Sequence, residues 1–267
     1  MQVDFGNVAD NYLKYRNDIP KRLVTELEMR EVVISGSKVA ELGAGPGLLS
    51  KMLSARGAVI DAVEPSTELI EAGRRHIGDE LEVVFREGYA EDTGLIDKNY
   101  DIVTVMRAWH WFDREATIKE VQRILKPGGH LIIMDSGFTS ASKIVKESMK
   151  TIQNYSPDRQ IRPAGTKDNA TQMINSFPVE WFEEWKSARF DLMELFKIDY
   201  DVKFTNEEWI GRLSSVSWVA GMKEKQRKNT LARVASYLEE HFPDTVHTIP
   251  HILSVAILKN KNIKNDT

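Results

Sequence analysis

Three glycines stand at alternate positions, Gly43, Gly45 and Gly47, in a chain of 267 residues. Glycine lets the backbone turn sharply and lets a ligand lie against bare main chain, so this spacing predicts a cradle for a nucleoside cofactor. A dinucleotide would require its third glycine at position 48, where the chain has Leu48. Glu41 adds a carboxylate that would repel a diphosphate and attract an ammonium group. The loop therefore favours a cationic amino-acid nucleoside over a nicotinamide cofactor.

A second acid, Glu64, follows the next apolar stretch, residues 58–63. This stretch predicts a second parallel strand, and a carboxylate at its end can accept hydrogen bonds from both hydroxyls of a ribose. The alternative is an exposed acid that caps the helix expected to begin near Ser66. We expect Glu64, with Pro65 beside it, to bind the ribose.

The glycine loop must be positioned by a strand and a helix. Apolar, β-branched residues from Val32 to Leu42 predict a buried strand before the loop, and apolar residues at helical spacing predict a helix from Leu48. Further strands are predicted at 81–85, 100–106, 130–134, 189–204 and 251–258, and a helix is predicted at 115–125.

Residues 39–48 resemble motif I, E/D-x-G-x-G-x-G, of the class I S-adenosylmethionine-dependent methyltransferases, and later segments up to residue 135 continue the resemblance in the family's order. The resemblance implies an α/β, doubly wound, Rossmann-like sheet of seven strands, mostly parallel with the last strand antiparallel, plus a helical cap. It implies one domain over residues 1–258, with lid helices at 5–30, a core at about 30–135 and 186–258, and a cap insertion at about 136–185. The polar residues 259–267 are expected to be disordered. The implied cofactor is S-adenosylmethionine, with S-adenosylhomocysteine as its product.

The N-terminal residues Ala9, Tyr12 and Arg16 resemble the A-x-x-Y-x-x-x-R pattern of small-molecule methyltransferases, whose lid helix folds over the cofactor. The family often continues with Arg-Pro, whereas this chain has Arg16-Asn17. The alternative is a helix that only packs on the core.

The turn after the third predicted strand reads Gly88-Tyr89-Ala90-Glu91, where the family often has G-D-A-E. The resemblance implies that Ala90 and a nearby acid contact the adenine. Because Tyr89 replaces the aspartate, either Glu91 takes over this contact or the tyrosine ring stacks on the purine. A simple polar turn is the other interpretation.

An aromatic segment, residues 107–113, follows the fourth predicted strand and resembles the A-x-H-W-F/x-D element of a subfamily that includes the trans-aconitate methyltransferases. Its composition is not that of a turn, so the segment is expected to line a site. Trp109 or Trp111 can attract the sulfonium by up to about 2 kcal/mol when water is excluded. His110 is expected either to act as a base or substrate donor or only to anchor the loop. Asp113 is expected to cap the next helix.

These stretches define the expected sites. The cofactor-binding residues are Glu41, Gly43, Ala44, Gly45, Gly47, Glu64, Pro65, Ala90, Glu91, Met106, Arg107, Tyr12, Tyr15 and Arg16. The substrate pocket is assigned to Trp109, His110, Trp111, Trp181 and Trp185, with His110 as the candidate catalytic residue. Core packing is the alternative for each tryptophan.

Composition narrows the function classes. A net charge of −4 supplies no field to gather nucleic acid, so no nucleic-acid partner is expected. The absence of cysteine removes thiolate nucleophiles and cysteine-ligated zinc, and the histidines lack a dependable metal spacing, so no metal is expected. No signal peptide or membrane-spanning run is evident, which predicts a soluble, cytoplasmic protein.

Methyl transfer from a sulfonium is an in-line displacement that mainly requires alignment and exclusion of water. We therefore expect transfer to a small, partly apolar molecule, by analogy a carboxylic acid, which needs no base. A hydroxyl or ammonium acceptor would need one, and His110 is the first candidate. The alternatives are a non-catalytic protein that binds S-adenosylmethionine or its product, an N- or C-directed enzyme, and an RNA methyltransferase. The oligomeric state is left open.

Overall fold

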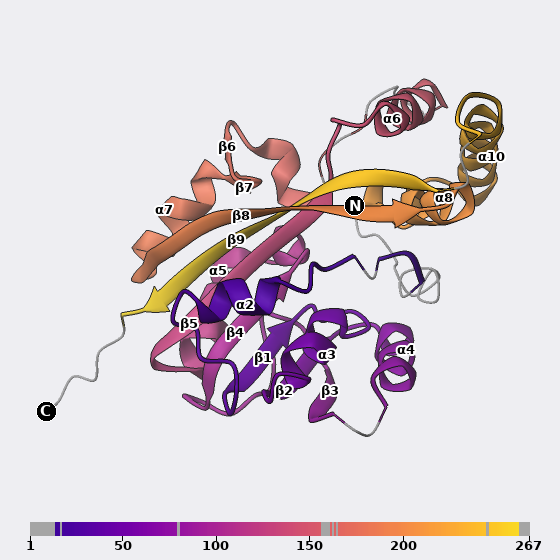
Figure 1. Ribbon diagram of the computed structural model, residues 1–267. Coiled ribbons are helices and arrows are strands. Elements are labelled where there is room, and N and C mark those ends of the chain that lie inside the picture. The colour runs from indigo at the N-terminus through magenta and orange to yellow at the C-terminus, as the bar shows by residue number, and fades with distance from the viewer. Residues whose placement is uncertain are drawn as a thin grey trace, which may run out of the picture.

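The computed structural model describes residues 14–16, 18–78, 81–155, 161, 163, 165–243 and 246–261. Its main sheet has seven strands in the order β3-β2-β1-β4-β5-β9-β8 (Figure 1). Pairing is parallel from β3 to β5, and β9 runs antiparallel to both of its neighbours. This arrangement confirms the predicted doubly wound sheet with an antiparallel last strand. The strands are β1 Lys38–Leu42, β2 Val59–Glu64, β3 Val83–Glu87, β4 Tyr100–Met106, β5 Leu125–Phe138, β8 Phe190–Phe204 and β9 His247–Asn260.

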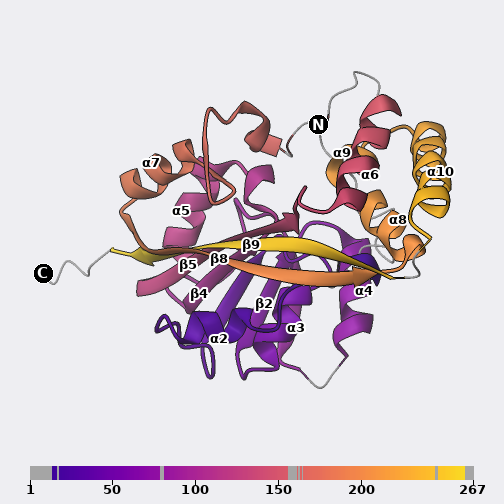
Figure 2. The same ribbon diagram turned by 45° about the horizontal axis from the view of Figure 1, so that its top comes forward.

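Helices cover both faces of the sheet (Figures 1 and 2). One face carries α2 Leu23–Glu28, α3 Leu48–Ser54 and α4 Thr67–Ile77, whose buried apolar residues share one core cluster with β1 and β2. The other face carries α5 Arg114–Ile124 and α7 Val179–Ser187, which share a second cluster with β4 and β5. Strands buried on both sides are typical of a parallel sheet, so the near-continuous apolar runs of the sequence are explained.

A helical subdomain packs at one end of β8 and β9 (Figure 2). It contains α6 Lys143–Tyr155, α8 Asn206–Ser214, α9 Ser217–Ala220 and α10 Glu224–His241. This differs from the predicted cap insertion at about 136–185. Only α6 comes from that range, whereas α7 packs on the sheet and the other three helices come from residues assigned to the core. The reason is the apolar face of α6, which buries Ile144 and Ile152 against Trp209 and Val234.

Short elements complete the described chain. The 3₁₀-helix η2 Trp109–Trp111 follows β4, and η3 Gly165–Asn169 precedes the small hairpin of β6 Met173–Ile174 and β7 Phe177–Pro178.

Two predicted boundaries are wrong. The first strand begins at Lys38 rather than Val32, because a turn with Gly36 at φ +76° interrupts the apolar run. The predicted disordered tail begins too early, because Lys259 pairs with His130 of β5 and Asn260 pairs with Phe190 of β8. Strand β9 is held on both sides, so its last polar residues continue the ladder, while residues 262–267 lie outside the described residues. No helix in the described ranges is long and apolar enough to cross a membrane.

Candidate active site

The glycine loop joins β1 to α3, and all three glycines have left-handed backbones, with φ of +65°, +56° and +70°. A Cβ on Gly43 would lie 2.7 Å from the Ala108 Cβ, and one on Gly47 would lie 2.8 Å from the Phe85 ring. At Gly45 no atom lies within 4 Å of that position. Packing therefore requires the outer two glycines, whereas the middle one borders open space that a ligand can use.

Glu64 closes over this loop from the end of β2. One carboxylate oxygen accepts a hydrogen bond from the Gly45 amide at 2.8 Å, and the other accepts from the Ser66 amide, beyond Pro65, at 3.1 Å. Burial raises the pKa of Glu64, and these two hydrogen bonds oppose that rise. Glu64 is only 7% exposed and the Ser66 hydroxyl caps α4, so the exposed-cap alternative for Glu64 is wrong.

Glu41 lies one layer deeper, where its carboxylate accepts a hydrogen bond from the Ser50 hydroxyl of α3. Burial raises the pKa of Glu41 to about 7, and the nearby charge of Glu64 acts in the same direction. A cation placed beside Glu41 would favour its ionised form. The carboxylate is therefore poised to gain a positive partner.

We predict that Glu41→Gln stabilises the ligand-free protein at pH 8 by roughly 3 kcal/mol. Because the folded pKa lies above the unfolded value of 4.5, the native carboxyl loses its stability advantage as pH rises through 7. The gain should therefore fade toward pH 5. Urea denaturation at the two pH values measures it, with the exposed Glu87→Gln as the matched control. An equal gain at both pH values would contradict the prediction.

A small hollow of about 20 Å³ lies beside the loop. It is lined by Ile19, Glu41, Gly43, Ala44, Pro46, Leu48, Leu49, Met106 and Arg107. Five predicted cofactor-binding residues therefore meet there. Sites for drug-sized ligands hold roughly 300–1,000 Å³, so this hollow is much smaller than a nucleoside site. Ile19, which lines it, belongs to the segment at residues 18–20, hereafter the strap.

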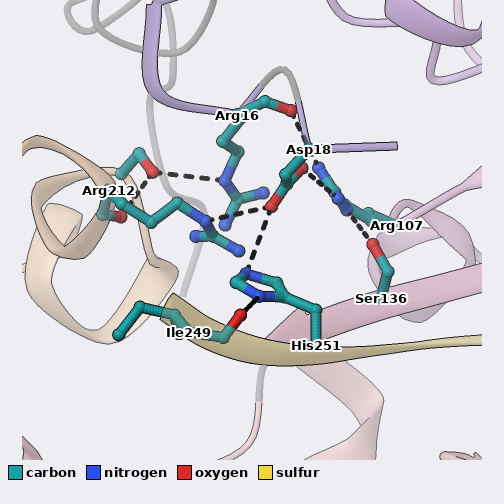
Figure 3. Close-up of polar contacts among 8 residues, drawn as sticks. Arg16, Asp18, Arg107, Ser136, Arg212, Ile249 and His251 are labelled. Carbon is teal, nitrogen blue, oxygen red and sulfur yellow. Dashed lines mark hydrogen bonds and ion pairs between the residues drawn. The ribbon is translucent and has the colours of Figure 1, made fainter. Parts of the chain in front are cut away.

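The strap is held by a buried ionic cluster (Figure 3). Asp18 pairs with the Arg107 guanidinium, and its second oxygen accepts a hydrogen bond from Arg212 Nε of α8 at 3.2 Å. His251 Nε2 of β9 lies 3.6 Å from the same carboxylate. Burial alone would raise the pKa of Asp18, but Arg107 and Arg212 hold it well below its usual range. The cluster thus joins the strap, the sheet and the helical subdomain.

Arg107 has a strained backbone, with φ +58° immediately after β4. Its Nε donates to the Ser136 hydroxyl at 2.6 Å, and Nη1 donates to the Arg16 carbonyl at 3.4 Å (Figure 3). The predicted cofactor residue therefore borders the hollow while its charged end binds the strap.

The predicted lid residues point elsewhere. Tyr15 is buried against α8, where a Cβ on Gly211 would overlap its ring. Arg16 Nε donates to the Ser215 hydroxyl at 3.2 Å. The Tyr15 ring thus packs on the helical subdomain rather than on the glycine loop, and Tyr12 lies outside the described residues.

In the turn expected at the adenine, the candidate acid already has a hydrogen-bond partner within the protein. Glu91 accepts a hydrogen bond from the Asp113 amide at 2.8 Å, while Ala90 is buried and the Tyr89 side chain is largely exposed. Asp113 in turn caps α5 through the Ala116 amide, as the sequence predicted.

Three of the predicted pocket tryptophans belong to the core. Trp109, Trp181 and Trp185 are buried in the cluster under α5 and α7. Trp111 is half-buried, and its ring lies 4.9 Å from that of His110. None of these tryptophans lines the hollow beside the glycine loop, which agrees with the packing alternative for the first three.

A larger open hollow of about 730 Å³ lies between α6 and the ends of β8 and β9. Its lining includes Lys146, Tyr200 and His251 and none of the residues predicted for the site.

His110 is 8% exposed, and burial lowers its pKa to about 3, with the charges of Lys167 and Arg16 acting in the same direction. Its imidazole is therefore neutral at physiological pH and a weak base. The η3 segment is pressed onto its backbone: Thr166 Oγ1 lies 3.3 Å from the His110 carbonyl, and a Cβ on Gly165 would overlap that oxygen.

Sequence reasoning missed a buried pair beside His110. Lys167 of η3 forms an ion pair with Asp135, and its ammonium lies 5.7 Å from the centroid of the Trp181 ring. Burial lowers the pKa of Lys167 to about 8. A lysine in a polar, glycine-containing insertion is expected to be solvated, so no local pattern could have revealed it. Among the described residues, no group of three His, Cys, Asp or Glu side chains is arranged to hold a metal ion.

Residues 40–133 match the family model described as a methyltransferase domain. An uncharacterized methyltransferase of Mycobacterium tuberculosis is 34% identical over 131 residues, which are 49% of this chain and 51% of the relative. This chain therefore spans about half the length of the first curated relatives it matches. A ubiquinone biosynthesis O-methyltransferase of Coxiella burnetii is 27% identical over 210 residues, 75% of this chain and 85% of the relative.

Among solved structures, a candidate type II methyltransferase from Anaeromyxobacter dehalogenans matches with a TM-score of 0.63 at 20% identity, covering 90% of this chain and 95% of its own. At this identity the likeness concerns the fold alone. The chain therefore shares the Rossmann-like fold of this neighbour, and its residues 40–133 are similar to a methyltransferase domain.

Proposed function

We propose that this protein transfers a methyl group from S-adenosylmethionine to an oxygen atom of a small, partly apolar molecule. The observation that carries the proposal is the clasp of Glu64 over the Gly45 amide, next to a glycine whose Cβ position borders open space. The match of residues 40–133 to a methyltransferase domain supports the same activity.

The residues of the loop fit this cofactor. Glu64 can exchange its backbone donors for the two ribose hydroxyls, and Glu41 can gain the amino-acid ammonium as its partner. When bound, the cofactor supplies an activated methyl group on a sulfonium. The protein's part is then to align the acceptor and exclude water, and the apolar side chain of Ile19, which lines the hollow, can contribute to that exclusion.

The acceptor is the least constrained part of the proposal. The Coxiella relative is named for O-methylation, which supports oxygen as the accepting atom. The carboxylic acid expected from the sequence remains a prediction, since a shared fold does not fix a substrate.

We expect Glu64→Ala to weaken S-adenosylhomocysteine binding by roughly 2 kcal/mol, about 30-fold in Kd, because hydrogen bonds to a charged carboxylate are lost. Isothermal titration calorimetry measures the change, and thermal melting checks that the variant is folded. Glu87→Ala is the matched control, because Glu87 is exposed and pairs in register with Glu64 on the neighbouring strand. Unchanged affinity in Glu64→Ala would remove this residue from the site.

Binding of a nicotinamide dinucleotide instead of S-adenosylhomocysteine would overturn the proposed function. Binding of S-adenosylmethionine without formation of S-adenosylhomocysteine in the presence of any acceptor would favour the non-catalytic alternative. Binding of RNA that weakens steeply with salt would favour the nucleic-acid alternative.

A further inference from the structure

Three polar side chains from separate elements meet at the carboxyl edge of β4 and β5. His110 lies in η2 just after β4, and Asp135 follows Met134, which pairs in register with the last residue of β4. Lys167 reaches Asp135 from η3, in the segment between α6 and α7. Strand β4 also pairs with β1, whose end carries the glycine loop. Ligands of doubly wound sheets bind at this edge, so these side chains stand where an acceptor must approach the cofactor.

Lys167 is placed there rigidly. Gly165 contacts the His110 backbone so closely that no side chain fits between them, and Thr166 contacts the same carbonyl. Lys167 itself is only 8% exposed. A long flexible ammonium seldom occupies such a position, because burial costs hydration that the single partner must offset.

The charged and titratable groups around Lys167 come from three segments. Asp135 of β5 pairs with its ammonium, while His110 of η2 lies within reach of the charges of both Lys167 and Arg16, which precedes the strap. Burial lowers the pKa of Lys167 to about 8, so a substantial share of neutral amine exists at slightly alkaline pH. The neutral amine is a strong enough base to accept the proton of an activated hydroxyl.

We propose that Lys167 is the general base of the reaction and that the acceptor is a hydroxyl compound, a phenol or an alcohol, rather than a carboxylic acid. This inference rests on the proposed function. In the step, the acceptor oxygen forms a bond to the methyl carbon as the carbon–sulfur bond breaks, and that electron pair stays on sulfur. The hydroxyl proton moves to Lys167 Nζ and leaves later to solvent.

The other two groups are less suited to this role. His110, with its pKa of about 3, holds a proton too weakly to take it from a hydroxyl. Asp135 is already bound to the lysine, and a carboxylate has an ordinary pKa near 4. A carboxylic acid acceptor would be ionised at neutral pH and would need no base.

The test compares wild type, Lys167→Met, Lys167→Arg and the control Lys186→Met, whose lysine is exposed on α7. The acceptors are two panels of aromatic compounds, one of phenols and alcohols such as catechol and cinnamyl alcohol, the other of carboxylic acids such as benzoate and cinnamate. Release of S-adenosylhomocysteine gives kcat and KM from pH 6 to 9.5, and calorimetry gives its binding.

We expect turnover of hydroxyl probes in the wild type, with kcat rising tenfold per pH unit up to about pH 8 and then levelling. Lys167→Met should lower kcat at least about 100-fold with cofactor affinity unchanged. Lys167→Arg keeps the charge and the Asp135 partner but cannot release its proton, so it should be as inactive as Lys167→Met. Lys186→Met should behave as wild type.

Full activity in Lys167→Arg would contradict the assignment of Lys167 as general base. A rise in KM without loss of kcat in Lys167→Met would contradict it as well. Either result would make Lys167 an anchor for an anionic acceptor. Turnover of carboxylates alone, independent of pH, would also overturn the assignment as general base while leaving methyl transfer intact. If the cofactor binds but neither panel is methylated, both the role of Lys167 as general base and the proposed catalytic function are contradicted. If the wild type does not bind the cofactor, the proposed function itself is contradicted.

Discussion

Replacing Asp18 with asparagine is expected to lower the free energy of unfolding by about 3–5 kcal/mol, the cost of breaking a buried ion pair by removing one partner. Both Arg107 and Arg212 would lose the carboxylate that they share, and all three side chains are almost fully buried. Asparagine keeps the volume and one hydrogen-bonding oxygen, so packing contributes little to this loss. The effect should be among the largest for any single polar side chain of the described residues.

The pH dependence follows from the sign of the shift. Because the pKa of Asp18 lies below its unfolded value, its stabilisation is complete above about pH 4 and is lost as pH falls further. The difference between wild type and Asp18→Asn should therefore stay constant from pH 8 to 5 and narrow in more acidic buffer. Denaturant unfolding at several pH values measures it.

Asp97→Asn is the control for this prediction, because Asp97 also pairs with an arginine, Arg123, but its side chain is 71% exposed. Surface pairs contribute at most about 1 kcal/mol. If Asp18→Asn destabilises no more than Asp97→Asn, the cluster does not hold the strap in place. The double variant Asp18→Asn/Arg212→Met should recover part of the loss, since one of the two buried cations that shared the carboxylate is removed.

The sheet and the glycine loop were predictable because their signals are local. Alternate glycines followed by apolar residues at helical spacing describe a strand–turn–helix unit in a dozen residues, and Gly43, Gly45 and Gly47 adopt the left-handed backbone that this unit needs. Glu64 was also accessible, since the length of one strand–helix–strand unit places the second acid beside the first strand. The boundary of β1 was missed because Val32 and Ile34 are buried without being in a strand, and apolar pattern alone cannot separate the two.

The ionic cluster could not be predicted, because its members are scattered from Asp18 to His251 along the chain. No local pattern links them: Arg107 was assigned to the cofactor site, and residue 251 begins a predicted strand. Only the folded topology brings these strand ends and α8 together around one carboxylate. The same holds for Tyr15, whose helical pattern predicts an apolar contact but cannot say that the contact is Gly211 of α8. The pairing of Lys167 with Asp135 is equally inaccessible from the sequence, because it depends on where η3 packs against η2 and β5.

The position of η3 depends on Gly165, and Gly165→Ala is expected to release η3 from η2. The alanine methyl would overlap the His110 carbonyl, and the residue has φ +55°, which disfavours any side chain. Strain of about 1–2 kcal/mol from the backbone and about 1–3 kcal/mol from overpacking favours separation of η3 from η2. The value of kcat should then fall, because Lys167 and His110 lose their fixed positions. Cofactor affinity should be retained, because Glu64 keeps its position.

Gly128→Ala separates backbone strain from steric overlap as the cause. Gly128 has φ +76°, but no atom lies within 4 Å of its Cβ position. It should lose only about 1–2 kcal/mol of unfolding free energy and keep its activity. Amide hydrogen exchange locates the change: Gly165→Ala should speed exchange in residues 165–169 and 109–111, whereas Gly128→Ala should leave both segments protected. Equal exchange and equal turnover in the two variants would mean that the contact between Gly165 and His110 does not position the lysine.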